Sequence, residues 1–153
     1  MNGIPGPPPV EALQRVALEW MDRVWRRHEI DAIDEIHAPD FVDRSAAGRG
    51  TDNASYKHGI ADFYSAFPDW SAVTEDLIVD VRSGTVALRW SATGTHSATY
   101  LGVAPTQRRI RFQGIEILRI EDGRIVERWG EWDGLGLLAQ LREGDPGSSA
   151  RST

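Results

Sequence analysis

A change of hydrophobic period near the middle of the chain is the feature that most constrains its fold. Before about residue 66 the apolar residues recur at helical spacing, and from about residue 70 they alternate with polar residues as in half-buried strands. Helices that precede a run of strands, instead of alternating with them, argue against a parallel βαβ sheet. The order predicts an α+β domain in which three N-terminal helices close over a strongly curved antiparallel sheet.

The same periodicity locates the individual elements. Three helices are expected at residues 9–26, 31–37 and 53–66, and four strands followed by a short helix at residues 70–81, 85–93, 109–120, 124–132 and 135–141. Asp52 or Asn53 can cap the third helix, because short polar side chains accept hydrogen bonds from the first turn. The second helix stops before Pro39, because the residue that precedes a proline avoids helical geometry.

Length and composition set the domain organisation. The 153 residues suffice for one domain, which we place at residues 9–142, and 41% hydrophobic and 26% charged residues are ordinary for a globular protein. The ends, residues 1–8 and 143–153, are rich in Pro, Gly and Ser and are predicted to be disordered tails.

Charge and composition argue against several classes of function. With a net charge of −6 and one short basic cluster at residues 108–111, the chain is not expected to bind nucleic acid or an anionic membrane. It shows neither the features of a signal peptide nor an apolar run long enough to span a bilayer, so a cytoplasmic location is expected. The absence of cysteine excludes disulfides, iron–sulfur sites and thiol chemistry.

The joint between the last two strands decides which side chains share a face. A two-residue turn at Asp122-Gly123 sets Glu116 opposite Trp129, whereas a three-residue turn sets it opposite Arg128. A shift of one residue moves every side chain to the other face of the sheet. We favour the three-residue turn, in which Gly114 also faces Gly130. The face then consists of Phe112, Gly114, Glu116, Leu118, Val126, Arg128, Gly130 and Trp132.

A glutamate beside an arginine on an apolar face has two interpretations. The pair of Glu116 and Arg128 is either an ion pair that orients the sheet or a pocket carboxylate whose pKa reflects a competition between burial and the neighbouring cation. The glycines Gly114 and Gly130 indicate either a bend in the sheet or room for a ligand against the backbone. If Gly130 faces a cavity, Gly130→Asp should fold, because its side chain enters open space.

Other polar residues carry weaker signals. His28, His37, His58 and His96 lack the spacing of metal ligands and are expected at the surface or in loops, so no metal site is predicted. Asp133 is interpreted as the N-cap of the last helix rather than as a catalyst. The chain has no dinucleotide-binding, Walker or GxSxG motif, and no cofactor is expected.

Several segments resemble the SnoaL-like polyketide cyclase family. They are HAPDFVD at residues 37–43, FPDW at 67–70 and GTHSATYLGVAPTQRRIRFQGIEILRIEDGRIVERWGEWDGLGLLAQL at 94–141. The resemblance implies a cone-shaped fold with an internal pocket, shared with ketosteroid isomerase, scytalone dehydratase, limonene epoxide hydrolase and nuclear transport factor two. It also implies a homodimer through the outer sheet face, here around Ile115, Ile117 and Trp129.

The resemblance also implies a reaction. The family's cyclases close a ring of an aromatic polyketide by intramolecular aldol condensation, without metal or cofactor. Aligned through DGRI, their acid–base aspartate falls at Gly130, their pocket histidine and glutamine at Glu116 and Gly114, and an asparagine of the early loop at Asp43. The fold therefore carries over more directly than the reaction, because function belongs to the site.

Three functions remain open at this point. The first is a cofactor-independent enzyme of cyclase, isomerase, dehydratase or epoxide hydrolase type that acts on a small, apolar, oxygenated molecule, with Glu116 transferring protons and Arg128 orienting it or stabilising enolate charge. Its expected pocket residues are Asp43, Trp90, Phe112, Gly114, Gly130 and Trp132. The second is a binding or accessory protein without turnover, because the aspartate position is a glycine. The third is a dimeric interaction module that uses the outer sheet face.

Overall fold

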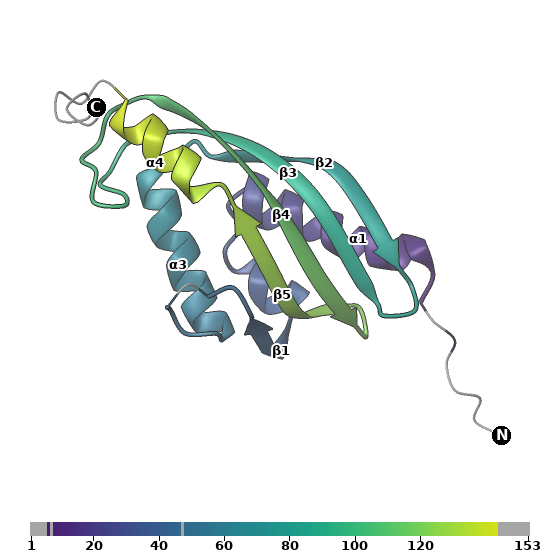
Figure 1. Ribbon diagram of the computed structural model, residues 1–153. Helices are drawn as coiled ribbons and strands as arrows, with labels where there is room; N and C mark the ends of the chain where they lie inside the picture. The colour runs from purple at the N-terminus through teal and green to yellow at the C-terminus, as the bar shows by residue number, and fades with distance from the viewer. Residues whose placement is uncertain (1–5, 7, 47, 144–153) are drawn as a thin grey trace.

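Most helices precede most strands along the chain, as the sequence predicts, although one short strand lies before the helix at residues 53–66. The computed structural model describes residues 6, 8–46 and 48–143, so the predicted tails lie outside the described residues except at 6, 8 and 143. The elements are α1 (Val10–Trp20), a π-helix (Met21–Arg26), α2 (Ala32–Ile36), β1 (His37–Asp43), α3 (Asn53–Ala66), β2 (Ser71–Asp80), β3 (Thr85–Thr95), β4 (Arg109–Glu121), β5 (Arg124–Trp132) and α4 (Gly134–Arg142) (Figure 1).

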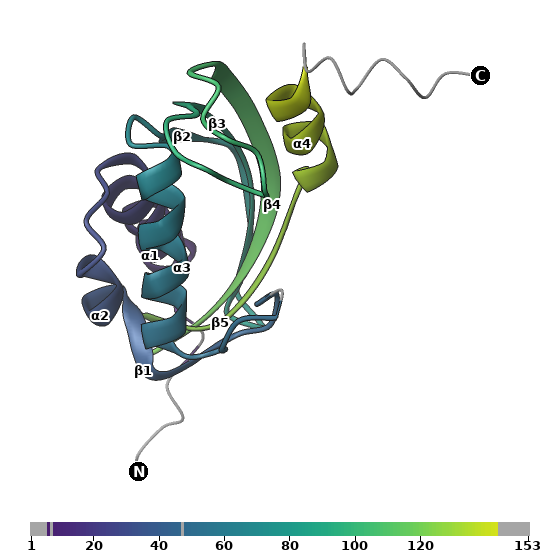
Figure 2. The same ribbon diagram turned by 90° about the vertical axis from the view of Figure 1, so that its left-hand side faces the viewer.

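The strands form one mixed, strongly curved sheet. Within the described residues it has five strands in the order β1-β5-β4-β3-β2, with β1 parallel to β5 and the other neighbours antiparallel. Figure 2 shows the sheet bending around α1 and α3, with α4 on the opposite side of β4. Buried apolar side chains from the helices and from the concave face pack into one core. The predicted α+β fold is confirmed.

The first helix changes form before it ends. The sequence predicts one continuous helix over 9–26, but its last part is a π-helix, and the N–H of Arg27 donates to the carbonyl of Asp22, five residues earlier. The wider turn changes the direction of the side chains that follow. As a result Trp20 and Trp25 both pack against the core, with ring centroids 5.8 Å apart.

β1 is a strand that the periodicity does not reveal. Proline cannot donate to a ladder and is confined to edge strands or bulges, and Pro39 lies in the edge strand of this sheet, where the register shifts between His37 and Val42. The burial of this segment does not alternate, so it carries no strand signature. The parallel pairing sets Asp43 beside Arg128 and so brings the early loop to the hairpin.

The turn between β4 and β5 differs from the predicted one. Asp122 and Gly123 have φ values of 49° and 75°, which are the left-handed values of a two-residue type I′ turn, so the three-residue turn is wrong. The predicted pairing of Gly114 with Gly130 is also wrong, since Gly114 lies opposite Trp132.

A bulge in β5 nevertheless preserves the predicted face. The register shifts beyond Arg119, where Val126 is the extra residue, and from there on Glu116 lies opposite Gly130 instead of Arg128. The bulge adds one residue to β5 and so compensates for a turn that is one residue shorter than predicted. Glu116 and Arg128 therefore still point to the same side of the sheet, as diagonal rather than direct neighbours.

Both predicted helix caps with an aspartate are present. Asp52 accepts a hydrogen bond from the N–H of Ser55 at 2.8 Å, and Asp133 accepts one from the N–H of Gly136 at the same distance. Each aspartate satisfies a backbone donor that a helix start leaves unpaired. The interpretation of Asp133 as an N-cap is confirmed.

The prediction that all four histidines lie at the surface or in loops is wrong for His37, which begins β1, whereas His96 lies in the loop after β3. His37 and His96 are fully enclosed. The Nε2 atom of His37 accepts from Trp20 at 2.9 Å, and its Nδ1 lies 2.9 Å from the amide oxygen of Asn53, which suits a neutral ring protonated on Nδ1. Burial lowers the pKa of His37 to about 4, so the ring is a neutral link inside the core.

Candidate functional site

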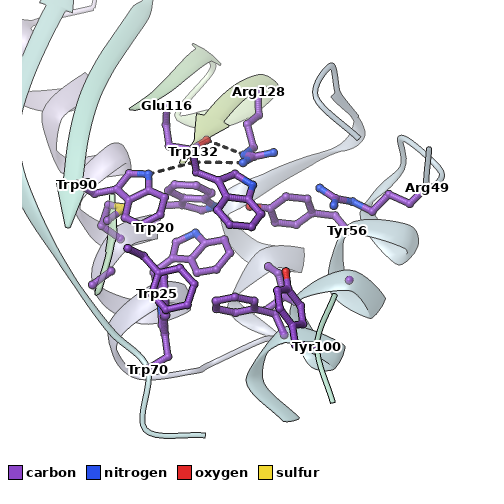
Figure 3. A pocket seen from close by; sticks show the side chains of 16 residues that line it. Trp20, Trp25, Arg49, Tyr56, Trp70, Trp90, Tyr100, Glu116, Arg128 and Trp132 are labelled. Atoms are coloured by element: carbon purple, nitrogen blue, oxygen red, sulfur yellow. Dashed lines mark hydrogen bonds and ion pairs between the residues drawn. The ribbon is translucent and has the colours of Figure 1, made fainter. Parts of the chain in front are cut away.

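A cavity lies between the helices and the concave face of the sheet. Its volume is about 120 Å³, close to the roughly 150 Å³ of a cavity known to hold one benzene molecule. Most of its wall is aromatic, formed by Trp20, Trp25, Tyr56, Phe63, Trp70, Trp90, Tyr100, Phe112 and Trp132 (Figure 3). The space therefore suits an apolar group about the size of a single ring.

The strands and α3 present these side chains by their regular periods. Phe112 and Glu116 lie four residues apart on β4, so both point to the concave face. Tyr56, Ile60 and Phe63 follow the i, i+4, i+7 spacing of one helical face on α3. The cavity is thus built where one sheet face meets one helix face.

Glu116 and Arg128 form a buried ion pair in the wall of this cavity. Arg128 Nε lies 2.7 Å from Glu116 Oε2, and its Nη2 donates to Oε1 at 3.1 Å. The indole N–H of Trp90 also donates to Oε1, at 3.2 Å. Glu116 is 3% exposed and Arg128 6%, so water does not compete for these contacts.

A second carboxylate holds the other side of Arg128. Its Nη1 donates to Asp43 Oδ1 at 3.0 Å, and Asp43 Oδ2 accepts from Arg49 at 2.6 Å. The side chain of Asp43 has no exposed surface, whereas that of Arg49 is 38% exposed. The four charges form an alternating chain that runs from the cavity wall to the surface, and we call Glu116, Arg128, Asp43 and Arg49 the ion chain.

Burial dominates the titration of Glu116. It raises the pKa of this carboxyl, and the charge and hydrogen bonds of Arg128 only partly oppose that rise. Sequence alone could not give this sign. A carboxyl with a raised pKa is a stronger base than an exposed one, which is the property expected of a proton-transfer group.

Gly130 lies directly beneath the ion pair. A Cβ atom built there would be 2.1 Å from Arg128 Nη2 and 2.3 Å from Glu116 Oε2. The expectation that Gly130→Asp enters open space is therefore wrong, because the two head groups occupy that space. Part of that space is taken by the Glu116 carboxylate, which reaches in from the neighbouring strand.

Gly114 makes room for an indole ring. A Cβ atom there would lie 2.5 Å from Cζ2 of Trp90, and 2.8 Å from the carbonyl oxygen of Glu131. The glycine lets Trp90 lie close against β4, where its N–H reaches Glu116. Gly114 thus shapes the site from below.

The predicted site residues divide into two groups. Glu116, Arg128, Trp90, Phe112 and Trp132 line the cavity. The remaining three lie behind this lining and are not in contact with the space itself: Asp43, Gly114 and Gly130. The predicted direct contact of these three with a ligand is corrected to a supporting position, because Arg128 and Trp90 stand between them and the cavity.

Sequence reasoning missed several lining residues. Tyr56 could have been found from the helical spacing with Ile60 and Phe63, all on one face of α3. Arg49 lies in the loop before α3 and carries no pattern that could have placed it. All tryptophans except Trp129 line the cavity, which is a larger share than the sequence suggested.

The described residues contain neither a metal cluster nor a spanning helix. In residues 6, 8–46 and 48–143 no group of three or more His, Cys, Asp and Glu side chains could hold a metal ion. No helix in the same part of the chain is long and apolar enough to cross a membrane.

The curved sheet, the helices that cover it and the cavity between them define a cone-shaped α+β protein. The sequence model of the SnoaL-like polyketide cyclase family matches residues 15–141. The chain belongs to this family, and the predicted resemblance is confirmed. A comparison with curated proteins finds no match.

Solved structures agree with this assignment. AclR from Streptomyces galilaeus, provisionally assigned as a hydroxylase, is 28% identical with a TM-score of 0.78, and the match covers 88% of this chain and 98% of that one. IdmH from Streptomyces antibioticus, provisionally assigned as a polyketide cyclase, is 30% identical with a TM-score of 0.74 over 84% and 97% of the two chains. A protein from Acidithiobacillus ferrooxidans with the same provisional assignment is 26% identical, with a TM-score of 0.77 over 89% and 98%.

Proposed function

We propose that this chain is a cofactor-independent acid–base enzyme that acts on a small, largely apolar, oxygenated molecule, as a cyclase or isomerase does. The observation that carries the proposal is the Glu116 carboxylate, which is buried in the wall of an aromatic cavity and fixed by Arg128 and Trp90. Membership of a polyketide cyclase family supports a small-molecule ligand. We place the protein in the cytoplasm, since a chain without cysteine needs no oxidising compartment.

The ion chain suggests how such a proton transfer proceeds. Glu116 takes a proton from a carbon next to a carbonyl group, and the electron pair of that C–H bond moves to the carbonyl oxygen as an enolate. Arg128 stays charged and in place when Glu116 becomes neutral, because Asp43 still holds it. The guanidinium can then stabilise the enolate. In a substrate with a neighbouring C=C bond, return of the proton from Glu116 to the far end of the dienolate moves the double bond and gives isomerisation. Attack of the enolate carbon on a second carbonyl forms the C–C bond of the ring, and the resulting alkoxide takes the proton back from Glu116.

A binding protein without turnover is the second candidate. It is favoured by Gly130, which lacks the side chain at the position of the family's acid–base aspartate, and by the close pairing of Glu116 with Arg128. Both candidates need the cavity, and they differ in whether Glu116 exchanges protons with the ligand. Deuterium uptake at the carbon next to the carbonyl of a bound ketone, measured in D₂O, separates them.

Ligand binding is the first prediction. Aromatic or terpenoid compounds with one ring should change the tryptophan emission, because five indoles surround the space. We expect dissociation constants in the micromolar range, which correspond to binding free energies on the order of −8 kcal/mol. The measurement is a fluorescence titration with a parallel melting curve. A broad panel that changes neither emission nor melting temperature would contradict a ligand pocket.

Dimerisation is the second prediction. Ile115, Ile117 and Trp129 are exposed on the outer sheet face, and Ile117 pairs with Trp129 across the strands. A contiguous exposed apolar patch of this kind is typical of an interface, and the family resemblance implies a dimer through this face. Light scattering at micromolar concentration should report twice the chain mass, and Trp129→Lys should shift it toward the monomer. A monomeric mass for the unaltered protein would contradict the predicted dimer.

A further inference from the structure

Tyr56 carries a buried hydroxyl group that the proton transfer above does not use. The residue lies on α3, lines the cavity and is 2% exposed. Its hydroxyl oxygen is buried and has no hydrogen-bond partner among the described residues. Buried hydroxyl groups are nearly always hydrogen-bonded, so an unpaired one at a cavity calls for an explanation.

Tyr56 differs from the other buried donors nearby. Tyr64, on the same helix, donates its hydroxyl to the carbonyl of Val24 and is therefore satisfied. The indole nitrogens of Trp25 and Trp70 are also unpaired, but these rings pack edge-on against each other and against Phe63, where an N–H can rest on an aromatic face.

Two cations fix the ring of Tyr56. The guanidinium carbon of Arg128 lies 5.3 Å from the ring centroid, and that of Arg49 lies 5.8 Å from it. Both distances fall within the range of cation–π attraction. Figure 3 shows the ring reaching from α3 into the pocket, between Arg49 and Trp132. The ring of Tyr56 is thus held in the wall of the same cavity that Glu116 lines.

The environment keeps this hydroxyl protonated. Burial raises the pKa of Tyr56 far above the physiological range, although the nearby Arg128 works in the opposite direction. A phenol that stays protonated keeps its O–H as a hydrogen-bond donor. An acceptor oxygen on a ligand in the cavity would satisfy this donor.

We propose that Tyr56 donates a hydrogen bond to an acceptor oxygen of the bound ligand and shares with Arg128 the stabilisation of negative charge on that oxygen. The inference rests on the proposed function and narrows its ligand class. The ligand carries one ring-sized apolar part and at least one carbonyl or similar oxygen within reach of Tyr56. A hydrocarbon of the same shape offers no acceptor atom, so it leaves the Tyr56 hydroxyl unpaired and gains no affinity from it.

The test compares two probes on two tyrosine variants. Acetophenone has one ring and a carbonyl group, and α-methylstyrene has the same shape with a methylene group in place of the oxygen. Tyr56→Phe should weaken acetophenone binding about tenfold, which equals about 1.4 kcal/mol, and should leave α-methylstyrene binding unchanged. Its melting temperature should not fall, since no protein hydrogen bond is lost.

Tyr64→Phe is the matched control. It removes a satisfied hydroxyl outside the cavity lining, so it should lower the melting temperature and leave both affinities unchanged. The role of Tyr56 would be overturned, but not the pocket, if Tyr56→Phe bound acetophenone as tightly as the unaltered protein does. The same conclusion would follow if Tyr56→Phe lost equal affinity for both probes. Failure of the unaltered protein to bind either probe would overturn the pocket and the role of Tyr56 together.

Discussion

Replacement of Arg128 by leucine should lower the free energy of unfolding by about 3–5 kcal/mol, the usual effect of removing one partner from a buried ion pair. Arg128 is the cation between Glu116 and Asp43, and all three side chains are buried. Leucine would leave Glu116 with only the Trp90 N–H. Asp43 would keep Arg49, whose partly exposed guanidinium is a weaker partner.

The loss should depend on pH. Without the guanidinium, the pKa of Glu116, which burial already raises, rises further in the folded state. A carboxyl whose folded-state pKa is raised contributes stability that is complete below its unfolded pKa and is lost as pH rises through the folded pKa. The free energy of unfolding of the variant should therefore be closest to that of the unaltered protein near about pH 4, the ordinary pKa of glutamate. The difference between the two free energies should be largest in alkaline buffer.

Arg26→Leu serves as the control for this prediction. Arg26 pairs with Asp22 at the surface of the π-helix, and its side chain is 53% exposed. Removal of such an exposed pair should change stability by less than about 1 kcal/mol. Urea unfolding curves of both variants at acidic and alkaline pH give the comparison. A loss for Arg128→Leu no larger than that for Arg26→Leu would show that the ion chain does not anchor the hairpin.

Periodicity predicted the parts of the fold that repeat. Helical and strand spacing placed α1, α3 and the strands β2 to β5 close to their observed ranges, because each buries one regular face. It could not reveal β1, whose burial does not alternate and whose pairing depends on a distant strand. Nor could it reveal the π-helix, since the apolar spacing of a wider turn is nearly the same over one turn.

Glu116 and Arg128 were correctly predicted to share a face of the sheet, although the predicted register was wrong. Glu116 and Arg128 each interrupt an apolar strand face, and that signal depends on parity alone. The bulge at Val126 compensated for the shorter turn, and no residue type in RIVERW marks which position is the extra one. Sequence could therefore predict that the two side chains share a face, but not that they meet diagonally above Gly130.

The sequence could not predict which of the site residues contact the cavity and which lie behind its wall. Asp43 was expected to contact the ligand, but it lies behind Arg128 and holds it in place. Gly130 was expected beside open space, yet the head groups of Glu116 and Arg128 fill it. Both positions depend on where long side chains from other strands end, which follows from packing and not from local pattern.

Replacement of Glu116 by glutamine should reduce deuterium uptake by a bound ketone at least a hundredfold, the usual scale for loss of a general base. Glutamine keeps the shape and can still accept from Trp90, while it cannot take a proton from carbon. Arg128 keeps Asp43 as a partner, so the loss of stability should be modest. Acetophenone in D₂O, followed by mass spectrometry, gives the rate, and tryptophan fluorescence gives the affinity of the same variant.

The pH dependence of this exchange carries further information. Only the ionised carboxylate accepts a proton, so the rate should rise with pH through the pKa of Glu116, which burial raises above its ordinary value. Glu116→Gln should remove this dependence. Glu121→Gln, an exposed position on the same strand, should retain both the rate and the pH profile. Uptake that is unchanged in Glu116→Gln would defeat the catalytic assignment, whatever the melting temperature does. Binding of the ketone by the unaltered protein, with exchange no faster than in buffer, would instead favour the binding protein without turnover.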